Sequence, residues 1–290
     1  MQKLIYQNIL GQQAVFFHAP FILCKVRGVG MSDVKATAVS GAYQQGESIV
    51  GLRREGRKVK LALHLMASDR TEMYRLRSGL LETLSADRAF DGTNRAKLIY
   101  ENDAGRRWTW AAPESGLDWG NRKQNVHPSL TLTFRCESPF WYAMTPNETS
   151  FRARENGLTL PAVFPFRLGS KVFSQTARNN GQSDAPVVAT IKGCGEQPAL
   201  VNDRTGAELR LVSPLPEGDV LTVNTDPAEL GVTVTHEDGT VENGFGLLSP
   251  ESSVAAFVLK PGDNTLRYVP QGDASHTVIE VSWFERFEGV

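Results

Sequence analysis

Apolar residues alternate with polar ones in several short segments of this chain, and this period of two constrains the fold more than any other feature. It is clearest in KVKLALHLM (residues 58–66) and SLTLTFRC (residues 129–136). Because successive side chains of a strand point to opposite faces, both segments are predicted to be half-buried strands of antiparallel sheet. The segment KLIYENDAGRRWTW (residues 97–110) predicts a hairpin that turns over residues 102–105.

One segment has the period of a helix instead. Between residues 69 and 85 the apolar residues recur at helical spacing and form one stripe: Met73, Leu76, Leu80, Leu81 and Leu84. Asp69 is expected to cap the first turn, and Glu72, three residues later, completes the pattern of a capping box. We therefore predict one α-helix at about residues 69–85 in an otherwise β-rich first half.

From about residue 160 onward the chain shows only strand patterns, separated by turn signals such as residues 238–239 and 261–264. Short strands at this spacing are typical of a β-sandwich. Residues 141–160 have no clear period and contain proline and glycine, which is typical of a linker or an irregular crossing strand. The sequence thus predicts a mainly β protein with two β-sandwich-type domains, residues 1–140 with the helix and residues 161–290, joined by a linker at 141–160.

Composition limits the partners of the protein. The 290 residues include 31 basic and 32 acidic side chains, and this net charge of -1 gives no basis for specific nucleic-acid binding. No apolar stretch has the length of a signal-peptide core or of a membrane span, so we expect no membrane insertion. Three widely spaced cysteines, Cys24, Cys136 and Cys194, are expected to be free thiols in a reducing compartment.

No pattern in the sequence predicts catalysis. The five histidines are scattered, and neither a nucleotide-binding glycine loop nor a nucleophile elbow is present. We therefore expect no catalytic residue, no cofactor and no metal site, and we predict that the protein is not an enzyme.

The densest basic run lies at residues 53–60 and contains Arg53, Arg54, Arg57, Lys58 and Lys60. A solvated turn before a strand is favoured over contact with a polyanion, because no aromatic residue is interleaved with these charges. The arginines are also candidates for a contact surface between proteins.

Two groups of aromatic residues raise the question of ligand stacking. Trp108 and Trp110 share one face of their predicted strand, where they either line a sugar site or belong to a core or interface. In CESPFWYAM (residues 136–144), Pro139 is expected to end the regular ladder, so that the next aromatic side chains point in different directions. We predict that Phe140 or Trp141 is a buried anchor at the hinge between the domains.

Several moderately specific blocks occur in order along the chain, chiefly FRCESPFWY (residues 134–142), NDRTGAEL (residues 202–209) and LKPGDNTLRY (residues 259–268). With the order strand, helix and hairpin in the first half, they make the chain resemble the distal tail protein family of siphophages, the bacteriophages with long non-contractile tails. The resemblance covers nearly the whole chain.

This resemblance implies a structural hub at the tip of a virion tail. Members of the family form a homo-hexameric ring through the N-terminal domain, and their C-terminal β-sandwich resembles galectins or carbohydrate-binding modules. The implied partners are other copies of the chain, the major tail tube protein, the tape-measure protein, and a tail-tip lysin, fibre or receptor-binding protein of the baseplate. The resemblance also implies assembly in the host cytoplasm.

A function of another class is a carbohydrate-binding adhesion module that recognises host cell-surface glycans. The predicted C-terminal sandwich and three tryptophans, Trp108, Trp110 and Trp283, suggest it. Binding of host cell-wall carbohydrate by that domain is the property that separates this alternative from the hub.

Overall fold

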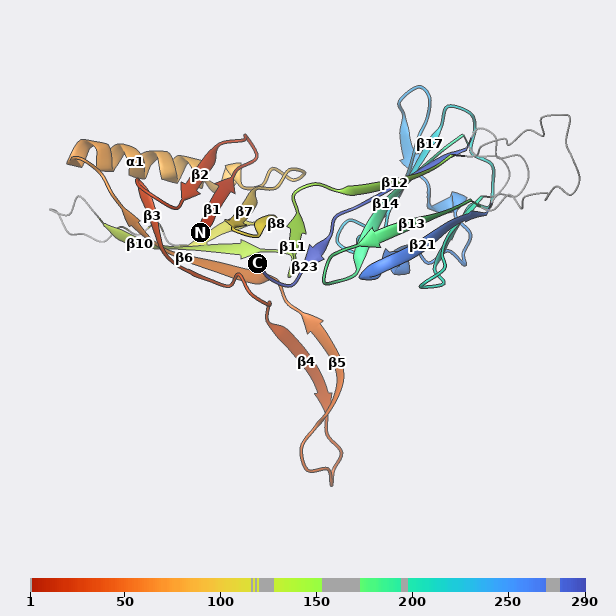
Figure 1. Cartoon of the computed structure of the whole chain (residues 1–290), viewed down its shortest axis with the longest axis horizontal. Coiled ribbons are helices and arrows are strands. Elements are labelled where there is room, and N and C mark those ends of the chain that lie inside the picture. The colour runs from red at the N-terminus through yellow and green to blue at the C-terminus, as the bar shows by residue number, and fades with distance from the viewer. Residues whose placement is uncertain are drawn as a thin grey trace, which may run out of the picture. The chain divides into compact units, whose positions relative to one another are not determined.

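The computed structural model describes residues 2–115, 117, 119, 128–152, 173–193, 198–269 and 277–290. The chain divides into two compact units, and Figure 1 labels many of their elements: unit 1 is Met1–Met144 with Phe287–Val290, and unit 2 is Thr145–Arg286. Unit 2 is thus inserted into unit 1. The range expected as a linker holds strands β11 (Trp141–Ala143) and β12 (Asn147–Arg152). Its residues 153–160, and residues 161–172 of the expected second domain, lie outside the described residues.

Unit 1 contains two larger sheets. The six-stranded sheet has the order β2, β1, β7, β8, β11 and β23, with bounds Gln13–Phe16, Lys3–Gln7, Lys97–Asn102, Gly105–Trp110, Trp141–Ala143 and Arg286–Phe287. The four-stranded sheet has the order β3, β6, β10 and β9, with bounds Phe21–Arg27, Arg57–Leu65, Ser129–Cys136 and Ala112–Ser115. The predicted hairpin at 97–110 is confirmed, because β7 and β8 pair antiparallel from Lys97 with Trp110 to Asn102 with Gly105.

The alternating pattern produces the core of unit 1. In β6 the apolar residues of the predicted stripe are at most 1% exposed: Val59, Leu61, Leu63 and Leu65. Val59, Leu61 and Leu63 share a cluster with residues of the other sheet, where the Tyr6 ring stacks on Phe134 at 5.2 Å, and Leu65 lies in a second cluster with Met73 of the helix. Both strands predicted from alternation, β6 and β10, are therefore confirmed, and one apolar core lies between the two sheets.

The predicted helix is α1 (Arg70–Thr83), followed by a short 3-10 turn at Ala86–Arg88. The Asp69 side chain accepts a hydrogen bond from the Glu72 backbone N–H at 2.8 Å, as expected of an N-cap. Glu72 accepts from the backbone N–H of Ser68 at 2.7 Å, one residue earlier than in a standard capping box. The prediction that Leu81 belongs to the apolar stripe is wrong. Leu81 is 48% exposed, because the buried face of the helix is the one that carries Met73 and Leu80.

A two-stranded arm extends away from the two sheets of unit 1 (Figure 1). It consists of β4 (Val34–Val39) and β5 (Ser48–Arg54), which pair antiparallel and join neither larger sheet. Nearly every residue of both strands is exposed. The arm was not among the elements predicted from the sequence.

Unit 2 is a β-sandwich. One sheet has the order β12, β22, β14, β17, β18 and β19, and β20 also pairs with β14. The bounds of its strands other than β12 are β22 (Val278–Trp283), β14 (Ala185–Lys192), β17 (Val220–Asn224), β18 (Gly231–Thr235), β19 (Val241–Asn243) and β20 (Val258–Leu259). The other has the order β13, β21, β15 and β16, with bounds Phe173–Asn179, Gly262–Val269, Ala199–Asn202 and Glu208–Arg210. Short 3-10 turns lie at Phe245–Leu247 and Val254–Ala256.

Residues of both sheets of unit 2 form one apolar cluster, among them Val223, Val281 and Leu266. The mainly β fold class predicted from the sequence is confirmed in both units. The likeness of unit 2 to galectins or carbohydrate-binding modules stays a prediction.

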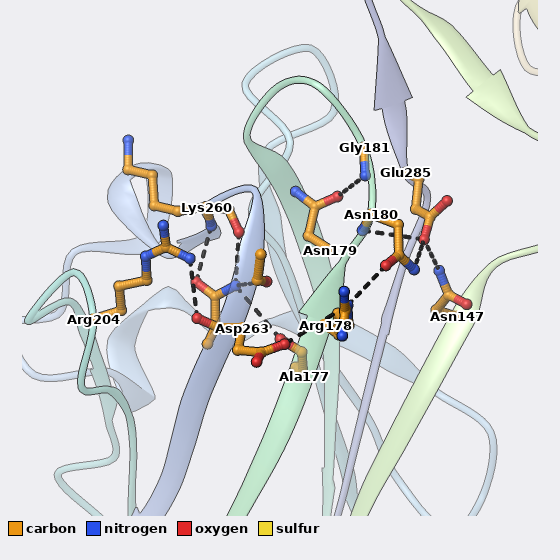
Figure 2. A network of polar contacts seen from close by, with 12 residues as sticks. Asn147, Ala177, Arg178, Asn179, Asn180, Gly181, Arg204, Lys260, Asp263 and Glu285 are labelled. Atoms are coloured by element: carbon orange, nitrogen blue, oxygen red, sulfur yellow. Dashed lines mark hydrogen bonds and ion pairs between the residues drawn. The ribbon is translucent and has the colours of Figure 1, made fainter.

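Buried asparagines hold the turns of unit 2. Asn264, fully buried, donates from its amide to the carbonyl oxygens of Lys260 at 2.7 Å and Gly262 at 3.0 Å, and accepts from the Lys260 N–H at 2.9 Å. Asn179 accepts from the Gly181 N–H at 2.9 Å, as Figure 2 shows. An amide that both donates and accepts fixes a turn without leaving its buried backbone groups unpaired.

Buried asparagine side chains of this kind occur in two of the sequence blocks. Asn264 belongs to LKPGDNTLRY, and Asn202 of NDRTGAEL, also fully buried, donates to the Val258 carbonyl at 2.9 Å. Nearby, the Glu285 carboxylate accepts from the side chains of Asn147 at 3.1 Å and Asn180 at 2.8 Å (Figure 2). Polar residues of these blocks therefore shape turns of unit 2.

We predict that Asn264→Ala lowers the free energy of unfolding of unit 2 by about 2–4 kcal/mol, because it leaves several buried backbone groups unpaired. The matched control is Asn180→Ala, an exposed amide on the same side of the unit, which should cost less than about 1 kcal/mol. Urea denaturation followed by circular dichroism measures both. Equal losses for the two variants would contradict the role given to Asn264.

Candidate functional site

The basic run and the aromatic stretch singled out in the sequence meet at the base of the arm in unit 1. The Arg54 guanidinium lies 5.5 Å from the centre of the Phe140 ring, and the Arg57 guanidinium lies 5.3 Å from the Trp141 ring. Such distances allow cation–π attraction. Four of the five residues expected at an interface therefore form one arginine–aromatic cluster: Arg54, Arg57, Phe140 and Trp141.

Arg57 is the centre of this cluster. Its side chain donates to the carbonyl oxygens of Gly30 at 2.9 Å, Gly28 at 3.3 Å and Glu288 at 2.9 Å, and also to that of Pro139. Arg57 is only 3% exposed, so the solvated turn expected here is wrong for this residue. A buried guanidinium is tolerated because backbone carbonyls replace its water.

Arg53 is solvated as expected, but it lies in strand β5 and not in a turn. The Arg53 side chain is 78% exposed and forms a loose pair with Glu55 at 3.7 Å. Arg54 makes a closer pair, with nitrogen–oxygen distances of 3.0 and 2.5 Å to the Glu288 carboxylate. Residues at the end of the described chain are thus bound by the arm base.

Two glycines let the backbone segments of this base approach each other. A Cβ at Gly28, where φ is +84°, would lie 1.9 Å from the Lys58 carbonyl oxygen. A Cβ at Gly56 would lie 2.8 Å from the Cys136 carbonyl oxygen. No side chain fits at either distance, so glycine is required on both sides of the arm base.

Burial governs the ionisation of the groups below the arm. It lowers the pKa of the Arg57 guanidinium, whereas Cys136 and Glu288 act to raise it. Burial raises the pKa of the Cys136 thiol to about 12, although the Arg57 charge acts in the opposite direction. Cys136 therefore stays a neutral thiol at neutral pH and is not a nucleophile there. Cys24 is an exposed free thiol, and Cys194 lies outside the described residues.

The two aromatic residues after Pro139 differ in burial. Trp141 is 0% exposed, lies in the core of unit 1, and has its ring 6.1 Å from that of Tyr100. Phe140 is half-buried. The expected burial is found for Trp141, which belongs to unit 1, whereas its role as an anchor at the hinge between the domains stays a prediction.

The tryptophans considered for sugar stacking are largely covered. Trp108 is 6% exposed; its ring stacks on Tyr142 at 4.9 Å and meets the edge of Trp110 at 4.7 Å. The Lys97 ammonium lies 4.7 Å from the centre of the Trp108 ring. Trp283 is 5% exposed in the core of unit 2. Of the three, Trp110 alone is half-buried, so these tryptophans offer no open pair of indole faces for a sugar.

Two hollows adjoin the base of the arm. The larger, of about 590 Å³, is lined by residues 53–58 and 135–137. The smaller, of about 170 Å³, is lined by the alanines at 89, 96, 111 and 112, by Phe90 and Trp110, and by Arg95. Arg135 and Glu137 line both, so the two hollows share a border. This places an apolar hollow beside a cationic one.

Outside the arm base, one titratable pair stands out in unit 2. The His236 ring nitrogen lies 2.7 Å from the Asp219 carboxylate, which raises the pKa of the histidine. Within the described ranges, no group of three or more His, Cys, Asp or Glu residues gathers to hold a metal. No helix in the described part of the chain has the length and apolar character needed to cross a membrane.

Over its whole length the chain has the fold of hub proteins from phage tails. The structure of the SPP1 Dit protein, described as a paradigm of the hub adsorption apparatus in phages that infect Gram-positive bacteria, matches with a TM-score of 0.68 at 15% identity and covers 99% of each chain. Chains of the phage P2 baseplate in its activated conformation match with a TM-score of 0.54. The structure with Ca is 13% identical and covers 100% of this chain and 99% of that one. The structure with Sr is 12% identical and covers 100% of both.

No protein-family model matches the chain, and no curated protein sequence matches it. At identities this low, the three structures establish the fold.

We predict that Arg57→Met costs about 3 kcal/mol or more of unfolding free energy, because methionine keeps the packing stem but leaves buried carbonyl oxygens without their donor. Lys58→Met is the matched control: this neighbour is 53% exposed and paired with Glu114, and its loss should cost under about 1 kcal/mol. Urea denaturation compares the two. A tolerated Arg57→Met would contradict the central position of this guanidinium.

A second prediction concerns the aromatic anchor. Trp141→Ala should cost about 3–5 kcal/mol, because it leaves a large cavity in the core of unit 1. Phe140→Ala, at a half-buried position, should cost about 1 kcal/mol. The measurement is the shift of the denaturation midpoint, and a larger loss for Phe140 than for Trp141 would reverse the roles assigned to the two rings.

Proposed function

We propose that this protein is the structural hub of a bacteriophage tail tip, a homo-hexameric ring that joins the tail tube to the baseplate. The observation that carries the proposal is the arm of unit 1, which presents an apolar face that no described residue of the same chain covers. The fold shared with the SPP1 Dit protein supports it, and so do the ordered sequence blocks.

The arm is amphipathic. Residues that pair directly across two strands lie on the same face, so Ala36 with Leu52 and Ala38 with Ile49 share one face with Val34. The opposite face carries Lys35 and Thr37 together with Val39, and the apolar face ends at the arm base with Arg54, the partner of Val34. Alternation of this kind is expected of a strand pair that has something apolar to cover.

Apolar side chains are concentrated there. Seven of the 18 large hydrophobic residues exposed in the described chain lie between positions 31 and 52: Met31, Val34, Val39, Tyr43, Ile49, Val50 and Leu52. An isolated two-stranded hairpin is marginally stable in water, and exposed apolar patches mark interaction surfaces. The arm therefore gains its cover from another protein chain.

A second copy is the occupant that produces a ring. An arm that docks on a different surface of the next copy makes a heterologous contact, and repetition of that contact closes a ring when the rotation fits. Arg53 and Arg54 lie at the root of the arm, next to the Arg57 and Trp141 anchor. In this proposal these residues fix the arm to unit 1 while its apolar face contacts the neighbour.

The partners and location proposed here follow the family resemblance. They are the major tail tube protein, the tape-measure protein and a lysin, fibre or receptor-binding protein at the tip, with assembly in the host cytoplasm and a final place at the virion tail tip. The role is structural rather than enzymatic. Because two of the three candidate tryptophans are buried, no observation favours the carbohydrate-binding alternative over the hub.

We predict that Leu52→Asp, a charge on the apolar face of the arm, abolishes ring formation, because the carboxylate would have to be buried in the subunit contact. Thr37→Asp, on the opposite face, is the matched control and should leave the ring intact. Light scattering over a range of concentrations and electron microscopy measure assembly, with the purified protein alone and with the tail tube protein.

A protein that stays monomeric at every concentration, and forms no ring with the tail tube protein present, would overturn the hub proposal. Rings that tolerate Leu52→Asp would show instead that the arm is not the contact.

A further inference from the structure

We propose that the tip of the arm, residues 40–47, docks into the two adjoining hollows at the arm base of the next copy, with Tyr43 in the apolar hollow and Glu47 against the cationic one. This inference rests on the proposed ring and names the contact that closes it.

Hydrogen bonds within the tip hold its turn in place. The Gln44 N–H donates to the Gly41 carbonyl at 3.0 Å, which closes a tight turn with residues 42 and 43 at its corner. The Gln44 side chain accepts from the Gly41 N–H at 3.2 Å and donates to the Ser48 hydroxyl at 2.8 Å. One side chain therefore ties together both sides of the loop.

Tyr43 stands at the corner of this turn and is fully exposed, at 101%. A large aromatic side chain held in water by an ordered turn loses little conformational entropy on binding, which makes it a suitable anchor. Tyrosine is also one of the residues that dominate binding energy at protein interfaces.

The apolar hollow matches a single ring. Its volume of about 170 Å³ is below the roughly 300–1,000 Å³ of sites for drug-sized ligands. Its walls are alanines, with the half-buried Trp110 and with Phe90, which is 50% exposed. Aromatic walls favour edge or offset stacking with an inserted ring.

The neighbouring hollow is cationic. Six cations line the two hollows, and four carboxylates pair with them: Arg53, Arg54, Arg57, Lys58, Arg95 and Arg135 against Glu55, Glu114, Glu137 and Glu288. Six against four leaves a surplus of two positive charges. Glu114 serves both Lys58 at 2.8 Å and Arg135 at 3.4 Å, so these two cations share a single carboxylate.

The charge of the tip is complementary. Glu47 is the only charged residue between positions 40 and 47. Arg135 borders both hollows and its side chain is 70% exposed, so it can meet a carboxylate close to a ring seated next to Trp110. Exposed cations of this kind steer association and fix register.

The arm base already binds a segment of its own chain that carries a carboxylate. The Glu288 carboxylate takes two hydrogen bonds from Arg54, and the Glu288 carbonyl accepts from Arg57. The Phe287 ring lies 3.6 Å from the Arg107 guanidinium. An aromatic residue next to a carboxylate, held by arginines, is therefore a combination that this surface recognises in cis.

Residues at the base of the arm line the larger hollow. Each copy therefore has one tip and one base, and a contact between the tip of one copy and the base of the next can repeat around a ring. The tip and the base are different surfaces, as a heterologous interface requires.

The experiment uses the full chain and measures the ring by light scattering and electron microscopy, alone and with the tail tube protein. Glu47→Arg and Arg135→Glu should each weaken assembly at least about tenfold in the concentration for half-assembly, and the double variant should regain it. Tyr43→Ser should weaken assembly similarly, whereas Tyr43→Phe should not. Glu251→Arg, an exposed charge of unit 2, is the control.

A covalent readout tests proximity directly. In a background with Cys24→Ser and Cys194→Ser, oxidation of the variant with Tyr43→Cys and Phe90→Cys should give a ladder of linked chains on a denaturing gel, and neither single replacement should do so. Circular dichroism confirms that each variant is folded.

Wild-type rings that tolerate all these substitutions, with no ladder, would overturn the docking of the tip and leave the hub proposal standing. The same holds if the charge reversals weaken assembly but the double variant does not regain it. Absence of rings from the wild-type protein, with the tail tube protein present, would overturn both.

Discussion

The structure of unit 1 depends on one buried guanidinium. Arg57 follows β5, the second strand of the arm, and donates to the carbonyl oxygens of Gly28 and Gly30, which precede β4, the first strand. It also donates to the carbonyl oxygens of Pro139, in the turn after β10, and of Glu288. A charge is costly to bury, and here four backbone carbonyls offset that cost. The arm, the aromatic stretch and the returning end of the chain are thus held at one point.

The exposed apolar face of the arm is unfavourable for an isolated chain but is expected of a subunit that assembles. Two exposed strands with apolar residues on one face gain little from packing within their own chain. The same surface is expected of a subunit contact, in which aromatic and apolar anchors carry most of the binding energy. In the proposed ring, the hydrogen-bonded base and the ordered turn at the tip would reduce the entropy lost on docking of the arm.

The sequence predicts what local periodicity encodes, and it fails where distant segments meet. The strands β6 and β10 and the helix α1 follow from alternation and helical spacing. The burial of Arg57 does not, because its acceptors lie up to 231 positions away. The arm does not follow from the sequence, because its two strands are almost wholly exposed and a register shift between Thr37 and Ala38 interrupts their pairing. Two of the sequence blocks contain Asn202 and Asn264, but only the structure shows that these side chains hold turns.

The insertion of unit 2 between Met144 and Phe287 has a consequence for synthesis. The ribosome makes all of unit 2 before it makes the residues that pair with β11 and bind Arg54, Arg57 and Arg107. Unit 2 is therefore complete as a polypeptide while unit 1 still lacks its last strand. The base of the arm therefore closes only after residues 286–290 have been made, so a chain interrupted before them lacks the groups that Arg54 and Arg57 bind.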